Sequence, residues 1–244
     1  MPNPQILEPI ARAVSSVVAQ AKLAHTLQTA TIALAGQGPL LLLAQKTLSQ
    51  EIKAQHAISE LIRRQRSLEI WAREVQDNSN HDINLPALIN IWVTIEALCE
   101  NLCVVILFTD ASALGCLKRI NQKIDETMTV TEESAREAYK LSLAKVKGGG
   151  LIHGFLTVFA AIGFTPELST SCISGLNELN YLRNCTLHRA GIVEPRKEKE
   201  APSFPFCIGD QIVVSDQLFT RLYDPATEFL QSLIPSLVKS GHLK

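Results

Sequence analysis

The stretch "ALINIWVTIEALCENLCVVILF" at residues 87–108 decides which kinds of fold are open to the chain. It is long enough to span a membrane, but Glu96, Glu100, Asn90 and Asn101 interrupt it. These side chains would be costly on a helix that faces lipid. We therefore expect a buried helix in a soluble protein that has no membrane contact.

Outward from this helix, apolar periodicity predicts further helices on both sides. Before it lie helices over 4–34 and about 40–75, separated by "GQGP" (36–39), and a polar loop over 76–86. After it, Thr129 and Glu132 have capping-box spacing, "GGG" (148–150) stops that helix, and a short helix spans 151–162. Thr165 and Pro166 are expected as the cap and first-turn proline ahead of a helix over 170–190, and a last helix runs over 216–239.

One short segment, "FCIGDQIVVS", predicts a small β-hairpin that turns at Gly209 and Asp210. The expected fold is therefore all-α, a helical bundle with this hairpin before the last helix. We divide the chain into an N-terminal helical extension, residues 1–80, and a helical domain, residues 86–244. The polar loop that ends in Pro86 marks the boundary.

Composition limits the function. The chain has 244 residues, of which 46% are hydrophobic, so a real core is expected. A net charge of −1 and only 5% aromatic residues mean that nucleic-acid contacts are local and do not rest on base stacking. The N-terminus lacks a targeting signal and the six cysteines form no CxxC pair, which favours a reducing cytoplasmic compartment; Cys99 and Cys103, four apart in the apolar helix, are expected in the core. We expect no metal and no cofactor.

The stretch "LNYLRNCTLHRAGIVEP" (179–195) carries the chemistry. Asn177, Asn180, Asn184 and His188 share one helical stripe, which is too neutral for open solvent and too polar for a core. This pattern indicates a shared surface in a homodimer. The simpler interpretation is a helix C-terminus, where His188 and the next arginine complement the helix dipole.

Arg183 projects toward the apolar side of the same helix, where a permanent cation needs a carboxylate. Glu96 falls on the apolar face of the 87–108 helix, so we expect a Glu96–Arg183 pair, with Glu100 as the second choice. If the pair is fully buried, removing Glu96 would cost about 3–5 kcal/mol. A plain buried salt bridge without function is the alternative.

The sequence "YLRNCTLHRAGIVEP" resembles the R-x4-6-H signature of the HEPN superfamily, over residues 86–240. The likeness includes the polar Asn184 directly after Arg183 and the trailing residues His188 to Val193. The resemblance implies an all-α bundle and a metal-independent endoribonuclease of toxin–antitoxin or antiviral defence systems. Family members that a nucleotidyltransferase silences carry a tyrosine two places after the histidine. Here that residue is Ala190, so this form of silencing is not expected.

These residue types suit RNA cleavage without a metal. His188 can act as base or acid near neutral pH, and a homodimer supplies two copies of it. Arg183 would stabilise charge on the phosphate, Asn184 would position the phosphate or orient His188, and Glu96 would hold Arg183. The expected partners are RNA, a second copy of the chain and an antitoxin protein. A non-catalytic module that binds RNA or protein, and a purely structural helical protein, stay open as alternatives.

Overall fold

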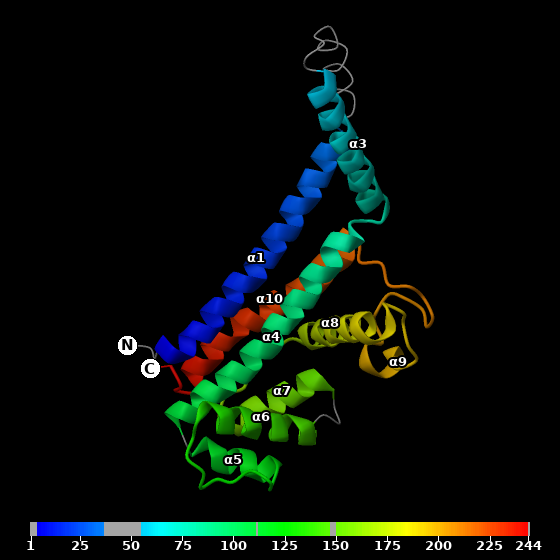
Figure 1. Ribbon diagram of the computed structural model, residues 1–244. Helices are drawn as coiled ribbons and strands as arrows, with labels where there is room; N and C mark the ends of the chain where they lie inside the picture. Colours follow the sequence, from blue (N-terminus) through cyan, green and yellow to red (C-terminus); the bar gives the residue numbers. More distant parts are fainter. Residues whose placement is uncertain (1–3, 37–54, 111, 147–149, 244) are drawn as a thin grey trace. The chain divides into compact units, whose positions relative to one another are not determined.

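The computed structural model describes residues 4–36, 55–110, 112–146 and 150–243. Every regular element in these ranges is a helix, so the predicted all-α class is confirmed (Figure 1). The helices are α1 (Pro4–Ala35), α3 (Gln55–Asp77), α4 (His81–Thr109), α5 (Ala113–Ile120), α6 (Glu132–Val146), α7 (Leu151–Ala161), α8 (Thr170–Arg189), α9 (Lys197–Glu200) and α10 (Asp216–Lys239). The predicted break at 37–39, the residues 40–54 and most of the "GGG" stop lie outside the described residues.

Two compact units make up the chain, and each is assembled from separated stretches. The larger unit comprises Met1–Ala19, Leu88–Ile212 and Thr220–Lys244. The smaller unit comprises Gln20–Ala87 and Val213–Phe219. Helices α1, α4 and α10 thus contribute residues to both units. The division into residues 1–80 and 86–244 stays a prediction.

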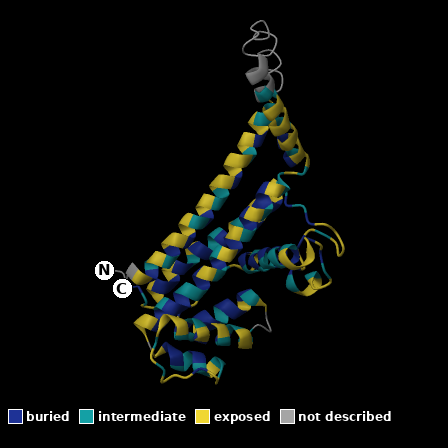
Figure 2. Cartoon of the chain, in the orientation of Figure 1, coloured by how far each residue is buried: buried dark blue, intermediate teal, exposed yellow. Residues whose placement is uncertain are grey.

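Helix α4 supplies much of the core of the larger unit because it is apolar on nearly all sides. Ile91, Trp92 and Ile95 are completely buried, and the ring of Trp92 stacks on Phe155 of α7 with 6.4 Å between centroids. Figure 2 shows the buried positions along this helix. By length and composition α4 could cross a membrane, and 56% of its most apolar window is buried within the protein.

Close backbone approach holds α8 against α10. A Cβ atom on Gly175 of α8 would lie only 2.3 Å from Cγ of Pro225 in α10, so only glycine fits there. The thiol of Cys172 also donates a hydrogen bond to the Pro225 carbonyl oxygen. On the other side, α8 contacts α7, which packs on α5 and α6. Helix α8, which we call the motif helix because it carries Arg183, Asn184 and His188, is therefore fixed between α7 and α10.

A polar cluster organises the smaller unit. The Asp216 carboxylate accepts hydrogen bonds from Asn80, Asn84 and Gln28, and Nδ1 of His81 accepts one from the backbone N–H of Val214. Asn84 is completely buried, so these bonds satisfy amide groups that would otherwise be costly to bury. Because Nδ1 of His81 is an acceptor, the ring is neutral, and burial lowers its pKa.

Three predicted boundaries are wrong by a few residues. The 76–86 loop is short, because residues 78–80 make a tight turn with positive φ at Ser79 and Asn80, and α4 begins at His81. Pro86 lies inside the helix. The cap of α6 is Thr131, whose side chain and backbone exchange hydrogen bonds with Ser134.

The cap of α8 was likewise expected too early, at Thr165 and Pro166. The helix begins at Thr170, and the side chain of Ser169 accepts a hydrogen bond from the backbone N–H of Cys172 at 3.0 Å.

The predicted β-hairpin at 206–215 is also wrong. Gly209 and Asp210 do turn the chain, and the Asp210 carboxylate accepts a hydrogen bond from the Cys207 N–H. The residues after the turn then pair with the segment that follows α8 instead of with 206–208, through one antiparallel bridge between Ile192 and Gln211. The residues after the turn therefore hold the segment that follows α8 in place, and they form no hairpin with 206–208.

Candidate functional site

The motif helix ends at a defined left-handed turn. Ala190 has φ 51° and Gly191 has φ 79°, and the N–H of each bonds the Cys185 carbonyl oxygen. The hydroxyl of Tyr181 accepts the Glu194 N–H and donates to the Glu194 carbonyl oxygen. This fold-back fixes the C-terminal end of α8, whose last two turns carry Arg183, Asn184 and His188.

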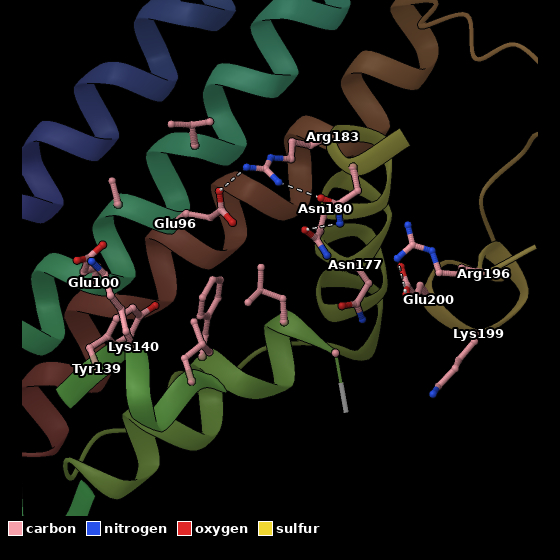
Figure 3. A pocket seen from close by; sticks show the side chains of 17 residues that line it. Glu96, Glu100, Tyr139, Lys140, Asn177, Asn180, Arg183, Arg196, Lys199 and Glu200 are labelled. Atoms are coloured by element: carbon pink, nitrogen blue, oxygen red, sulfur yellow. Dashed lines mark hydrogen bonds and ion pairs between the residues drawn. The ribbon is translucent and has the colours of Figure 1, made fainter. Parts of the chain in front are cut away.

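One open groove of about 840 Å³ lies in the larger unit beside this helix (Figure 3). We call it the Arg183 groove. Its walls come from α4, α6, the start of α7, α8 and α9. The polar residues that line it are Glu96, Glu100, Tyr139, Lys140, Asn177, Asn180, Arg183, Asn184, Arg196, Lys199 and Glu200.

The expected Glu96–Arg183 pair is present, but it is more open than predicted. Nη2 of Arg183 lies 3.9 Å from Oε2 of Glu96, and the two side chains are 26% and 31% exposed. Glu100, the second choice, pairs instead with Arg136 of α6 at 2.9 Å. Because the pair lines a groove, water reaches it and the full cost of a buried charge does not apply.

Arg183 belongs to a chain of polar contacts that runs along α8. Nη1 donates to Oδ1 of Asn184 at 3.0 Å, and Nδ2 of Asn184 donates to Oδ1 of Asn180 at 3.4 Å. Nε of Arg183 is buried and has no hydrogen-bond partner among the described residues. Asn177, Asn180 and Asn184 all line the groove, as their common helical stripe predicts, but His188 of the same stripe does not, and the homodimer surface inferred from the stripe stays a prediction.

His188 lies outside the groove. It is exposed, at the last turn of α8, and no described residue bonds its ring. Leu187, four residues after Arg183 on the same side of the helix, is 53% exposed. The apolar face therefore ends one turn earlier than the periodicity indicates, because the chain turns away after Arg189.

Several groove residues were not found from the sequence. Lys140 comes from α6 and Lys199 from α9, and no sequence signal links these lysines to Arg183. Tyr139 forms part of the wall, and burial raises the pKa of its phenol far above the usual range, so the hydroxyl stays protonated. Arg196 pairs with Glu194 at 2.8 Å, which raises the pKa of the guanidinium.

The described residues give little support for a metal. No group of three metal-ligating side chains comes together within them. Cys99 and Cys103 are buried free thiols on α4, and burial raises the pKa of Cys103 to about 12. Such thiols remain protonated and behave as small apolar groups.

In comparisons with known proteins, no family model matches the chain, and no curated protein or solved structure matches it significantly.

Proposed function

We propose that the chain is a metal-independent endoribonuclease of the HEPN type, with Arg183 and His188 as its catalytic residues. The observation that carries the proposal is the setting of Arg183. Its guanidinium lies next to Glu96 and Asn184 at the wall of an open groove, and the side chain is 26% exposed. A cation presented in this way suits the charge that develops on a phosphate during cleavage.

His188 supplies the proton transfer in this proposal. It lies four residues after Asn184, on the same side of α8, and it is accessible. A histidine imidazole can take the proton of the ribose 2′-OH or protonate the leaving 5′ oxygen. The 2′-oxygen would then bond to phosphorus as the 5′-oxygen bond breaks, which leaves a 2′,3′-cyclic phosphate.

A homodimer completes the site. His188 does not line the groove of its own chain, and exposed Leu187 and Ile192 flank it in sequence, 53% and 42% accessible. Apolar side chains beside a functional polar residue favour a surface that a second copy covers. Two copies would bring two histidines to one cleft, one as base and one as acid. Sedimentation at micromolar concentrations tests this, and a monomer throughout would contradict it.

The deciding experiment is incubation of the purified protein with total RNA in excess EDTA. We expect cleavage to persist and the products to carry 2′,3′-cyclic phosphate and 5′-hydroxyl ends. Cleavage that stops in EDTA, or ends of another kind, would contradict a mechanism without metal. As a fold-matched negative control, the Arg183→Ala protein should leave the RNA intact.

A non-catalytic module that binds RNA or protein is the second candidate. It is favoured by the position of His188, whose ring has no partner among the described residues to orient it. Under this alternative the purified protein binds RNA without cleaving it, in EDTA or with added Mg²⁺.

A further inference from the structure

The charges that line the Arg183 groove are not balanced. Each of its three carboxylates is in an ion pair with an arginine: Glu96 with Arg183, Glu100 with Arg136, and Glu200 with Arg196. Arg136 also pairs with Glu132, and Arg196 also pairs with Glu194, so the arginines offset part of the negative charge of the groove. Two further cations line the groove and belong to none of these pairs.

Lys140 and Lys199 are these two cations. Both line the groove, both are exposed, and the ammonium group of neither has an ion pair or hydrogen bond with any described residue. Figure 3 shows them at the two ends of the groove, with Asn177 and Asn180 between them. They come from different helices, α6 and α9, so the tertiary fold and not the local sequence brings them to one groove.

The groove offers no ring for base stacking. Its two aromatic side chains, Tyr139 and Phe155, are 4% and 2% exposed, so their faces are covered by the core. A ligand here meets free ammonium groups and asparagine amides. Such a surface suits a phosphate backbone rather than unstacked bases.

We propose that Lys140 and Lys199 bind backbone phosphates on either side of the phosphate that Arg183 contacts, and that the groove thereby tracks single-stranded RNA. This inference rests on the proposed function. It adds two binding residues that lie away from the Arg–His motif. It also makes recognition electrostatic and tolerant of base sequence, because phosphates carry no sequence information.

The test measures binding separately from cleavage. The probe is a fluorescent oligouridylate with 2′-O-methyl groups, which lacks the attacking hydroxyl and does not pair with itself. The variant Lys140→Ala/Lys199→Ala is compared with Lys123→Ala/Lys145→Ala, which removes the same charge from exposed lysines outside the groove. Melting curves check that both variants are folded.

We expect the groove variant to lose affinity by roughly eightfold per lysine in about 50 mM salt. The slope of the logarithm of the binding constant against the logarithm of the salt concentration should become shallower by about 0.7 per lysine. The control variant should bind like the parent. Equal losses in both variants, or no loss in either, would overturn the inference. If the parent still cleaves RNA in that case, the proposed function stands without it. A parent that neither binds nor cleaves RNA refutes both.

Discussion

Two of the ion pairs that helix α8 makes differ in how far water reaches them. Glu178 faces α10 and pairs with Arg221, and its side chain is only 3% exposed. Arg221 also donates a hydrogen bond to the Ser203 carbonyl oxygen at 2.9 Å. One and a half turns further along α8, Arg183 pairs with Glu96 at 3.9 Å in the open groove.

The difference separates a structural pair from one that has capacity for a ligand. Burial raises the pKa of Glu178, and Arg221 offsets part of that rise, so the pair mainly limits the cost of a buried carboxylate. The groove pair is loose, with 3.9 Å between its charged atoms, and the Arg183 side chain is 26% exposed at the groove wall. Breaking the first should affect stability, whereas breaking the second should affect activity.

The largest effect is expected for His188→Ala. The side chain is exposed, so its truncation opens no core cavity and the melting temperature should stay close to that of the parent. Loss of proton transfer should lower the RNA cleavage rate by ~10²–10⁴-fold. Single-turnover assays in EDTA measure the rate. Cleavage at the parent's rate would remove His188 from the mechanism.

Arg183→Ala should be nearly as damaging to activity. Removal of one preorganised electrostatic contact typically costs about 10²–10³ in rate. The pair is partly solvated, so we expect the free energy of unfolding to fall by only about 1 kcal/mol. Arg183→Lys keeps the charge but not the fork of donors, and should be intermediate in rate. An Arg183→Ala protein that unfolds at room temperature would show that the groove pair is structural after all.

Arg221→Ala gives the opposite result on the other side of α8. It leaves the Glu178 carboxylate buried without its partner, which costs ~3–5 kcal/mol where burial is complete. The Arg221 side chain is 43% exposed, so we expect a loss nearer to 2 kcal/mol. Denaturant unfolding measures it. Cleavage by the folded fraction should be unchanged, and a selective loss of activity would erase the distinction between the two pairs.

The part of this arrangement that local sequence determines was predictable. The 87–108 helix is buried because apolar side chains lie on nearly all its faces, and helical phase placed the asparagines of α8 on one stripe. The Glu96–Arg183 pair followed from two charges on apolar faces. Each of these inferences needs only the period of a helix.

What escaped prediction depends on packing between distant segments. Glu178 lies between Asn177 and Leu179 in the sequence, and nothing there points to Arg221, 43 residues later. Ile212 bonds across to Gly191, a pairing that a turn at Gly209 does not reveal. His188 lies outside the groove, although helical phase places it on the same stripe as the asparagines.

Glu96→Gln is the subtler test of the Glu96–Arg183 pair, the open pair in the groove. We first expected a loss of several kcal/mol from full burial, but a partly solvated pair at 3.9 Å supports a loss below about 1 kcal/mol. Cleavage should fall by less than for Arg183→Ala, because Asn184 still holds the guanidinium. Thermal melts and rate assays on the same preparation check both. A stability loss as large as that of Arg221→Ala would mean that the two pairs are equivalent.

The smallest expected effect is a pH dependence of stability that arises from the Glu178–Arg221 pair, which we call the closed pair, and not from the Glu96–Arg183 pair. Burial raises the pKa of Glu178 above its ordinary value of 4.5. Between 4.5 and the raised value the folded protein binds more protons than the unfolded chain, so the free energy of unfolding decreases as pH rises through this window. Arg221→Ala should steepen the decrease, because the arginine holds the pKa of Glu178 down, and Glu178→Gln should abolish it.

His81 contributes the opposite slope, since its lowered pKa means that stability is lost as pH falls below 6.5. Urea titrations from pH 4 to 7 therefore compare each variant with the parent, which cancels the histidine. A Glu178→Gln protein whose slope matches the parent's would show that Glu178 is already charged throughout the window, and that the closed pair is as well solvated as the open one.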